Sequence, residues 1–502
     1  MNPVVSFRKF LAVIAVAACS TSFCSTVFGQ YDKASDPPAE LKEGFEAITI
    51  EQSKEWLGIL AGPKFEGRGT GQPGYTKAAH WVAGKLAEFG LEPIGDNGTF
   101  FQMLPMKRRL PVIEECFIEG PDGMKVEGLG KLGFDRYTDN QETTGEIVFV
   151  NFPNDNAEIP EEVSLRDKIV IYSSPINSKS AAVKIQRKRP AAFLRVVEGV
   201  PGSLSQLVRK GRRGRSTNVS GTINQEAADG MVTAFKGEDW LKRTEDEDAK
   251  TVAVHETGES VTLRMRYREE QAAVPNVVAW LEGSDPKLKH EYVVVGSHLD
   301  HLGIQGGQVF PGADDNGSGS TAVLNIAKAF ATNSTRPKRS VMFIWFAAEE
   351  IGLVGSRHYT DNPTKSLDNM TCMFNIDMVG RNEETKDETS EENEGSIHLV
   401  GSMKGETDLH SLVLEANKHV GFRFELDEER VWNRSDQVNF YRKGVPVAFL
   451  FGGFHPDYHR PSDKVSEINF KKIVSAAKLY YGAINLASEH GRFQMKETKK
   501  EK

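Results

Sequence analysis

The second half of the chain alternates short apolar runs with longer segments whose apolar residues recur at helical spacing. The apolar runs are NVVAWLEG (276–283), YVVVGSH (292–298), SVMFIWFAAEE (340–350), CMFNIDMVG (372–380) and VPVAFLFGG (445–453). The helical segments are STAVLNIAKAFATN (320–333) and KKIVSAAKLYYGAINLAS (471–488). Strands that alternate with helices in this way predict an α/β sheet with helices on both faces.

The N-terminal part follows a different pattern. Residues 50–91 predict helices on either side of a glycine-rich segment, GRGTGQPG (67–74). Apolar residues then return at helical spacing over 75–90, and Gly90 is the residue type expected at the end of a helix.

A third pattern covers about 111–271, where short β-rich runs are bounded by turn residues. The clearest are GEIVFVNFP (145–153) and DKIVIYSSP (167–175). Two basic runs, 186–190 and 209–215, are more typical of a solvated face than of a binding site for an anionic partner. We therefore predict a separate β-rich domain, inserted between the other two patterns.

The composition of the 502-residue chain is that of a soluble globular protein with several domains. Hydrophobic residues make up 39% and charged residues 26%, which argues against a disordered chain and against a membrane bundle. The net charge of -8 argues against a nucleic-acid binder, because such proteins are normally basic. The acidic tract at 383–395 is most simply an exposed loop.

The first 29 residues have the organisation of an export signal. Arg8 and Lys9 precede the apolar run FLAVIAVAA (10–18), and small and polar residues follow. The apolar run is short for a membrane span, which needs roughly 20 mostly apolar residues. We expect removal of 1–29 and a secreted or periplasmic protein without a stable membrane span.

The cysteines bear on the lipid anchor and on metal binding. Cys19 ends VAAC (16–19), which resembles a bacterial lipobox, so lipidation of Cys19 is the alternative to simple export. Beyond the signal only Cys116 and Cys372 remain, which is too few for a disulfide scaffold, and whether they pair stays open. The sequence has no Cys-x-x-Cys pair, which excludes a structural thiolate zinc site.

The strands of the second half end in carboxylate or imidazole side chains. In open α/β sheets, ligands bind beyond the carboxyl ends of the strands. The residues found there are His298, Asp300 and His301, then Asp314 and Asp315, Glu349 and Glu350, Asp377, and finally His455, Asp457, Tyr458 and His459. Each group alone has an ordinary explanation as a turn, a helix cap or a core histidine. Together, at successive strand ends, they predict a metal site.

Charge supports this interpretation. Carboxylates gathered without cations raise one another's pKa, and no lysine or arginine adjoins these strand ends before Arg381 and Arg460. One or two divalent metal ions would remove the conflict. Histidine and carboxylate ligands without thiolates suit zinc in a hydrolytic site.

At this point a family resemblance is apparent. The ordered motifs GSHLDHLG, GADDNGSGS, FAAEEIGLVGS, NIDMVGR and DYHRPSDK resemble those of the zinc aminopeptidase and glutamate carboxypeptidase family of two-metal exopeptidases. The segment 65–93 resembles the same family. The resemblance implies a three-layer α/β/α sandwich with a mixed, mostly parallel sheet. The β-rich block resembles the protease-associated domain that many members insert, mainly through LRDKIVIYSSP (165–175).

The predicted organisation has five parts. They are a signal peptide (1–29), the N-terminal part of the peptidase domain (30–110), the inserted protease-associated-like domain (111–271), the catalytic zinc peptidase domain (272–490) and a charged tail (491–502).

The resemblance also implies a role for each matching residue. His298 and Asp377 would bind one zinc ion, Glu350 and His459 a second, and Asp315 would bridge the two; Asp300 would orient His298, Glu349 would be the general base, and Tyr458 would donate a hydrogen bond to the developing oxyanion.

Some assignments have rivals. Asp314 is the alternative bridge. His455 and His459 have the spacing of a helical zinc pair, although Pro456 disfavours a helix there. His301 is expected at the rim, near the substrate.

The function expected from the resemblance is an exported two-zinc metallo-aminopeptidase that acts on peptides with a free N-terminus. The alternatives are a carboxypeptidase or dipeptidase of the same fold, a glutaminyl cyclase-like enzyme, and a non-catalytic receptor-like relative. A carboxypeptidase needs a cationic clamp for the terminal carboxylate, for which Arg381, Arg434 and Arg460 are the candidates. The substrate side chain that the enzyme prefers has no motif to reveal it.

Overall fold

The structure is a computed structural model. It describes residues 34–127, 131–134, 141–175, 180–198, 206–208, 219–235, 246, 248–305, 308–426 and 430–495. The expected signal peptide and Cys19 lie outside these residues. In the part of the chain that is described, no helix has the length and apolar character needed to cross a membrane.

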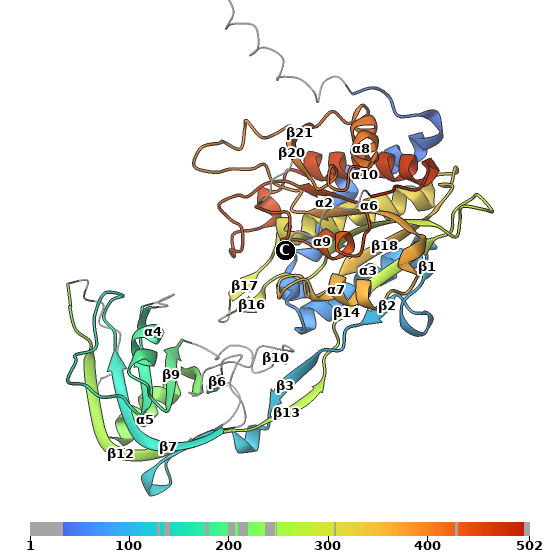
Figure 1. The fold of residues 1–502 in the computed structure, drawn as a ribbon. Helices are drawn as coiled ribbons and strands as arrows, with labels where there is room; N and C mark the ends of the chain where they lie inside the picture. The colour runs from blue at the N-terminus through green and yellow to red at the C-terminus, as the bar shows by residue number, and fades with distance from the viewer. Residues whose placement is uncertain are drawn as a thin grey trace, which may run out of the picture.

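The larger sheet contains the strands of the second half of the chain (Figure 1). In the described residues it has nine strands, in the order β1-β14-β18-β15-β19-β22-β20-β21, with β2 paired to β14. Their bounds are β1 (Glu92–Pro93), β2 (Phe101–Met103), β14 (Pro275–Leu281), β15 (Tyr292–His298), β18 (Ser340–Phe346), β19 (Met370–Asp377), β20 (Ser396–Val400), β21 (Arg423–Leu426) and β22 (Val447–Phe451). The five predicted strands of the second half are confirmed.

This sheet is mixed. Strands β18, β15, β19 and β22 run parallel to one another, while β14 and β20 run antiparallel to their neighbours β18 and β22. The carboxyl ends of the four parallel strands therefore meet at one edge.

Both faces of the sheet are covered. In β15, Val293 and Val295 belong to one hydrophobic core and Val294 to another, because successive side chains of a strand point to opposite faces. This explains why the strands are apolar throughout instead of alternating. The helices of the first core are α1 (Lys42–Ala47), α2 (Ile50–Leu60), α3 (Pro73–Glu88), α6 (Gly319–Thr332), α8 (Leu409–Asn417) and α10 (Phe470–Glu489). Helices α7 (Val354–Asp361) and α9 (Gln437–Tyr441) pack on the second.

The glycine-rich segment between α2 and α3 passes close to the strand ends. Gly67 has a φ of 68°, and a Cβ at this position would lie 2.0 Å from the carbonyl oxygen of Phe310. Only glycine fits such a close backbone approach. Two residues further on, Gly69 forms an isolated β-bridge with His301. A short hairpin, β16 (Gly303–Gln305) and β17 (Gln308–Phe310), follows that histidine.

The β-rich middle block forms a separate lobe, with hydrophobic cores of its own (Figure 1). Its eight-stranded sheet has the order β5-β4-β12-β7-β8-β9-β11-β6 over the residues described. The bounds are β4 (Phe117–Glu119), β5 (Lys125–Glu127), β6 (Leu132–Phe134), β7 (Gln141–Asn151), β8 (Ile169–Ser173), β9 (Ala192–Val197), β11 (Val219–Asn224) and β12 (Ala253–Met265). It also contains α4 (Ser180–Arg187) and α5 (Gln225–Ala234), which the β-rich pattern did not indicate.

Two strands connect this lobe to the rest of the chain. β3 (Lys107–Pro111) pairs with β13 (Tyr267–Gln271), and β10 (Gln206–Val208) pairs with β3. The predicted limits of the inserted block, 111 and 271, fall at the ends of β3 and β13.

The two cysteines in the described residues, Cys116 and Cys372, are both free and buried. Burial raises the pKa of the Cys372 thiol to about 12. Cys372 therefore behaves as a small apolar side chain within β19.

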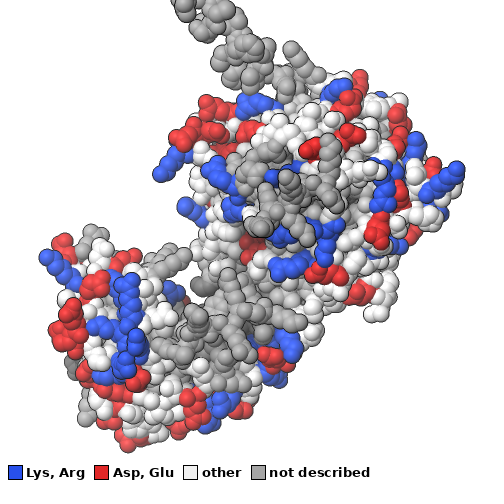
Figure 2. All heavy atoms as spheres, in the orientation of Figure 1, with Lys and Arg blue, Asp and Glu red and all other residues white. Residues whose placement is uncertain are grey.

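Charged side chains intermix over the face seen in Figure 2, on both lobes. The acidic tract at 383–395 lies between β19 and β20 and is mostly exposed, as predicted for a loop. Two of its residues turn inward: Glu383 lies 2.8 Å from His398 Nε2, and Asn393 is buried.

Candidate metal centre

The strand ends bring the predicted site residues together. His298 is the last residue of β15 and Asp377 the last of β19, while Glu349 follows β18 and His459 follows β22. Because these strands are parallel, the four side chains converge on one edge of the sheet, where open α/β sheets bind their ligands.

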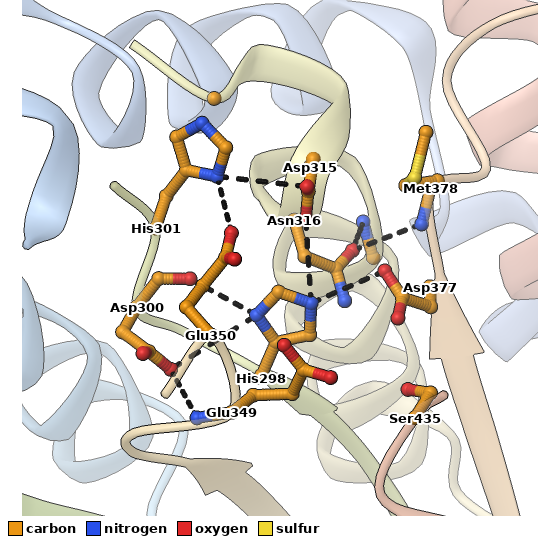
Figure 3. A network of polar contacts seen from close by, with 12 residues as sticks. His298, Asp300, His301, Asp315, Asn316, Glu349, Glu350, Asp377, Met378 and Ser435 are labelled. Atoms are coloured by element: carbon orange, nitrogen blue, oxygen red, sulfur yellow. Dashed lines mark hydrogen bonds and ion pairs between the residues drawn. The ribbon is translucent and has the colours of Figure 1, made fainter. Parts of the chain in front are cut away.

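The first group of candidate ligands consists of His298, Asp315 and Asp377 (Figure 3). His298 Nε2 lies 3.2 Å from Asp377 Oδ1 and 3.4 Å from Asp315 Oδ1. On the other side of the ring, Nδ1 donates a hydrogen bond to the carbonyl of Asp300 at 2.9 Å. This bond fixes the ring orientation and directs Nε2 toward the two carboxylates.

The second group lies on the other side of Asp315. Asp315 Oδ2 is 3.0 Å from His459 Nε2 and 3.6 Å from His301 Nδ1. Glu350 completes the group, with Oε1 2.7 Å from His301 Nδ1 and Oε2 3.3 Å from His459 Nε2. The two oxygens of Asp315 thus face two different groups, as a bridging carboxylate must.

The alternative bridge, Asp314, belongs to neither group. Its Oδ1 accepts a hydrogen bond from Gly380 N at 2.6 Å, and its Oδ2 lies 3.2 Å from His455 Nε2. His455 likewise belongs to neither group, and the segment from His455 to His459 has no helical structure. The geometry therefore does not favour either rival assignment.

His301 does not lie at the rim, so that expectation is wrong. Its side chain is fully buried, and its backbone N–H donates to Arg68 O at 3.1 Å. The bridge between Gly69 and His301 draws this residue inward. His301 is therefore a candidate ligand that sequence reasoning missed, although its position directly after Asp300 was the available signal.

The orienting role expected for the Asp300 carboxylate falls instead to the Asp300 carbonyl. The carboxylate oxygen Oδ1 is 4.0 Å from His298 Nδ1 and instead accepts from Glu349 N at 3.0 Å. Its other oxygen accepts from the Thr70 hydroxyl at 2.5 Å. Asp300 therefore positions His298 with its backbone and Glu349 with its side chain.

The two adjacent glutamates differ in their partners. Both oxygens of Glu350 face histidines, and the hydrogen bonds from His301 and His459 outweigh the effect of burial and hold the pKa of Glu350 well below its usual range. The Glu349 carboxylate has no hydrogen-bond partner among the described residues, and burial raises its pKa. Glu350 is thus arranged as a ligand, and Glu349 as a group free to exchange a proton.

Tyr458 lies beside the second group. Its ring stacks on His459 with centroids 3.9 Å apart, and its hydroxyl oxygen accepts a hydrogen bond from Arg434 Nη2 at 3.2 Å. Burial raises the pKa of Tyr458, so the hydroxyl keeps its proton at neutral pH. That proton is available for donation into the pocket that Tyr458 lines together with Glu349 and His459.

Sequence reasoning also missed the residues that hold the Asp315 loop. Asp463 is buried and accepts the backbone N–H groups of Asp314 and Asp315. Asn316 donates to Ile376 O and accepts from Met378 N, which ties the loop to the end of β19. None of these contacts has a motif, because they join segments far apart in the sequence.

Arg68 provides a second support. Its guanidinium is fully buried and donates to the carbonyls of four residues: Leu60, Leu299, Pro311 and Gly312. Burial lowers the pKa of Arg68 to about 10, so the side chain remains charged at neutral pH. It joins the His298 segment to the Asp315 loop, and it comes from the glycine-rich segment that the sequence singled out.

The donor set fits divalent metal ions. The carboxylates of Asp315, Asp377 and Glu350 belong to the two groups of candidate ligands. The nitrogen ligands in these groups are imidazoles. Arg68 is close but directs its donors at carbonyls. Nitrogen and carboxylate ligands without thiolates match zinc.

Zinc binding should release protons. Asp377 and Glu349 raise the pKa of His298 against the opposing effect of burial, and the partners of His459 raise its pKa to about 10. Both imidazoles are therefore protonated in the metal-free protein at neutral pH, and zinc must displace those protons. We expect about two protons released per chain at pH 7.5, and a zinc affinity that increases with pH until these histidines are deprotonated.

Calorimetric titration of zinc into the metal-free protein, in two buffers of different ionisation enthalpy, measures this release. The variant His80→Ala removes a histidine outside the site and should leave the count unchanged. A zinc affinity that stays constant between pH 6 and pH 8 would contradict the expectation.

Comparison with known proteins places this site in a family context. Residues 276–484 match the sequence model described as Peptidase family M28. Over 207 residues, the chain is 30% identical to aminopeptidase YwaD of Bacillus subtilis, which covers 39% of this chain and 41% of the relative. Over 217 residues, it is 27% identical to a probable leucine aminopeptidase of Arthroderma otae, which covers 41% and 56%. The chain spans about half the length of these relatives, or less.

A solved structure supports the fold. The structure of a zinc aminopeptidase from Bacillus subtilis aligns with a TM-score of 0.53 at 19% identity, covering 88% of this chain and 95% of that one. At this level of identity the likeness concerns the fold alone.

Proposed function

We propose that this chain, whose residues 276–484 match the sequence model of Peptidase family M28, is a metallo-aminopeptidase that works with two zinc ions. The observation that carries the proposal is the position of Asp315, whose two oxygens face two different histidine–carboxylate groups. The relatives named as aminopeptidases support the reaction class.

The two groups supply ligands for both ions. His298 and Asp377 would hold one and Glu350 and His459 the other, with Asp315 between them. His301 is a further candidate ligand of the second group. Zinc held by these residues would supply a Lewis acid, which would acidify a water molecule and polarise the scissile carbonyl.

The protein's own residues would move the protons. Glu349 lies in the pocket with a carboxylate free of other partners, and would take a proton from the attacking water and pass it to the leaving amine. Asp300 holds the Glu349 backbone in place for this. The Tyr458 hydroxyl would donate to the oxygen on which negative charge develops.

Charge in the pocket favours a substrate with a free α-amine. Glu349 and Asp377, which both carry a carboxylate, line the pocket. These groups accept hydrogen bonds, and a substrate ammonium donates them. We infer that the amine is held on this side, next to the reacting carbonyl.

The finer descriptions of fold and compartment are part of the proposal. We assign the nine-stranded sheet and its helices to the three-layer zinc exopeptidase sandwich, and the second lobe to an inserted protease-associated domain. The apolar run at 10–18, behind two basic residues, supports export to the periplasm or the medium, with a lipid anchor at Cys19 as the alternative.

One dipeptide in three forms tests the direction of attack. We expect the zinc-loaded enzyme to cleave Leu-Ala and its C-terminal amide but not N-acetyl-Leu-Ala, because acetylation removes the ammonium. The measurement is product formation by chromatography. Cleavage of the acetylated peptide together with resistance of the amide would identify a carboxypeptidase instead.

A further inference from the structure

An open pocket lies beside the metal centre. Away from the candidate ligands, its wall is mostly apolar. The apolar lining consists of Met378, Val431, Phe449, Phe451 and Phe454. Four of these residues belong to one hydrophobic cluster at this end of the sheet and Phe454 packs against it, so the wall is preformed.

Arg434 is the cationic residue of this lining other than the two histidines. Its guanidinium lies over the ring of Phe454, 5.0 Å from the centroid, and donates one hydrogen bond to the Tyr458 hydroxyl. Among the described residues it has no carboxylate partner. A guanidinium has five N–H donors, so most of its donors stay free to meet a ligand.

The two other arginines considered as carboxylate clamps are placed differently. Arg381 is paired with Asp457 at 3.0 Å and does not line the pocket. Arg460 is exposed and also lies outside the lining. The structure thus separates Arg434 from both.

We propose that Arg434 forms a carboxylate-binding subsite, and that the preferred substrates are short peptides that carry a carboxylate near the scissile bond. The subsite itself rests on geometry, whereas its use in cleavage rests on the proposed function. The carboxylate comes from an acidic N-terminal side chain or from the C-terminus of a dipeptide. A guanidinium binds either of them through paired hydrogen bonds.

The distribution of charge across the pocket suits a substrate that carries an ammonium at one end and a carboxylate at the other. Carboxylates at the strand ends attract the substrate ammonium, while Arg434 repels it and attracts an anionic group. A chain of contacts connects Arg434 to the metal centre. Arg434 donates to the Tyr458 hydroxyl, the Tyr458 ring stacks on His459, and His459 Nε2 lies 3.0 Å from Asp315 Oδ2. A small zwitterionic peptide can therefore bind the strand-end carboxylates with its ammonium and Arg434 with its carboxylate.

Kinetics with four substrates test the subsite. Leucine anilide and Leu-Ala amide lack a carboxylate, whereas glutamate anilide and Leu-Ala are their anionic counterparts. We expect at least one anionic member to have a kcat/KM about ten- to a hundredfold above its neutral counterpart. Arg434→Gln should abolish that preference, and Arg434→Lys should retain part of it. Arg336→Gln removes an exposed arginine outside the pocket and should behave as the wild type.

The two pairs identify the source of the carboxylate. Loss of preference only in the anilide pair assigns the subsite to an acidic side chain, and loss only in the Leu-Ala pair assigns it to the C-terminus. A wild type without preference in either pair overturns the proposal. An equal decrease on all four substrates in Arg434→Gln also overturns it, because Arg434 would then act through Tyr458 alone.

A binding measurement separates this subsite from the peptidase proposal. Leu-Ala, glutamate anilide and their neutral counterparts are titrated calorimetrically into zinc-loaded Glu349→Gln protein, with and without Arg434→Gln. Weaker binding of an anionic ligand alone upon Arg434→Gln supports the subsite even if no substrate is cleaved. Equal binding of the anionic ligands with and without Arg434 overturns it, whatever the activity.

Discussion

Glu349→Gln is expected to lower kcat by a factor of about 10² to 10⁴ while the zinc content stays unchanged, because a general base contributes this much and the amide cannot accept the proton. The structure explains why the zinc content should stay unchanged. The Glu349 carboxylate has no hydrogen bond to any described residue, while its backbone N–H is held by Asp300. Glutamine fills the same space without disturbing either group of ligands. Steady-state kinetics and elemental analysis of the same preparation measure both quantities.

Glu350→Gln is the matched control at the neighbouring position. Both of its carboxylate oxygens face histidines, so this variant should lose zinc at limiting metal concentration. If Glu349→Gln lost the metal and Glu350→Gln kept it, the roles of base and ligand would have to be exchanged. Circular dichroism of both variants checks that the fold is retained.

The arrangement of the strand ends could be predicted from the sequence because it depends on local rules. An apolar run of about seven residues between turn residues predicts a buried strand, and parallel strands share one edge. His298 and Asp377 end such runs, and Glu349 follows one. A fold that places these strands next to one another and in parallel brings the three side chains together.

The supports of the site could not be predicted, because they depend on contacts between distant segments. Arg68 donates to carbonyls up to 244 residues away, and Asp463 accepts N–H groups 148 and 149 residues before it. A buried arginine or aspartate is normally unfavourable, so composition favours exposure for both. Only the assembled fold shows that carbonyls and N–H groups surround them.

The same limit explains the error at His301 and the incomplete account of Asp300. In the sequence, His301 is one residue beyond a predicted carboxylate and looks like part of a loop. In the structure, its main chain pairs with the glycine-rich segment, which turns the imidazole toward Glu350. Thr70, from that same segment, engages the Asp300 carboxylate and leaves its carbonyl to hold His298. Both outcomes depend on a contact across more than 200 residues.

Asp315→Asn is expected to reduce the zinc content from two ions per chain to less than one and to abolish measurable turnover. The physical reason is that Oδ1 faces His298 while Oδ2 faces His459, so one side chain serves both groups. An amide offers one neutral oxygen in place of two charged ones, which weakens both positions together. Mutation of a residue that only hydrogen-bonds to a metal ligand typically lowers the metal affinity about 10- to 100-fold. Mutation of a ligand that two ions share should lower the affinity by at least that factor. Elemental analysis after dialysis against limiting zinc measures the effect.

Asp314→Asn is the control, because it changes the adjacent residue in the same chemical way. Asp314 accepts from Gly380 N and faces His455, outside both groups, so this variant should keep its zinc. The loss of one charged hydrogen-bond acceptor in a buried network should cost about 1–3 kcal/mol of stability, visible as a lower Tm. Loss of zinc in Asp314→Asn, with retention in Asp315→Asn, would make Asp314 the bridge. Loss of only one ion in Asp315→Asn would restrict its carboxylate to a single metal and remove the structural basis for a shared, two-metal centre.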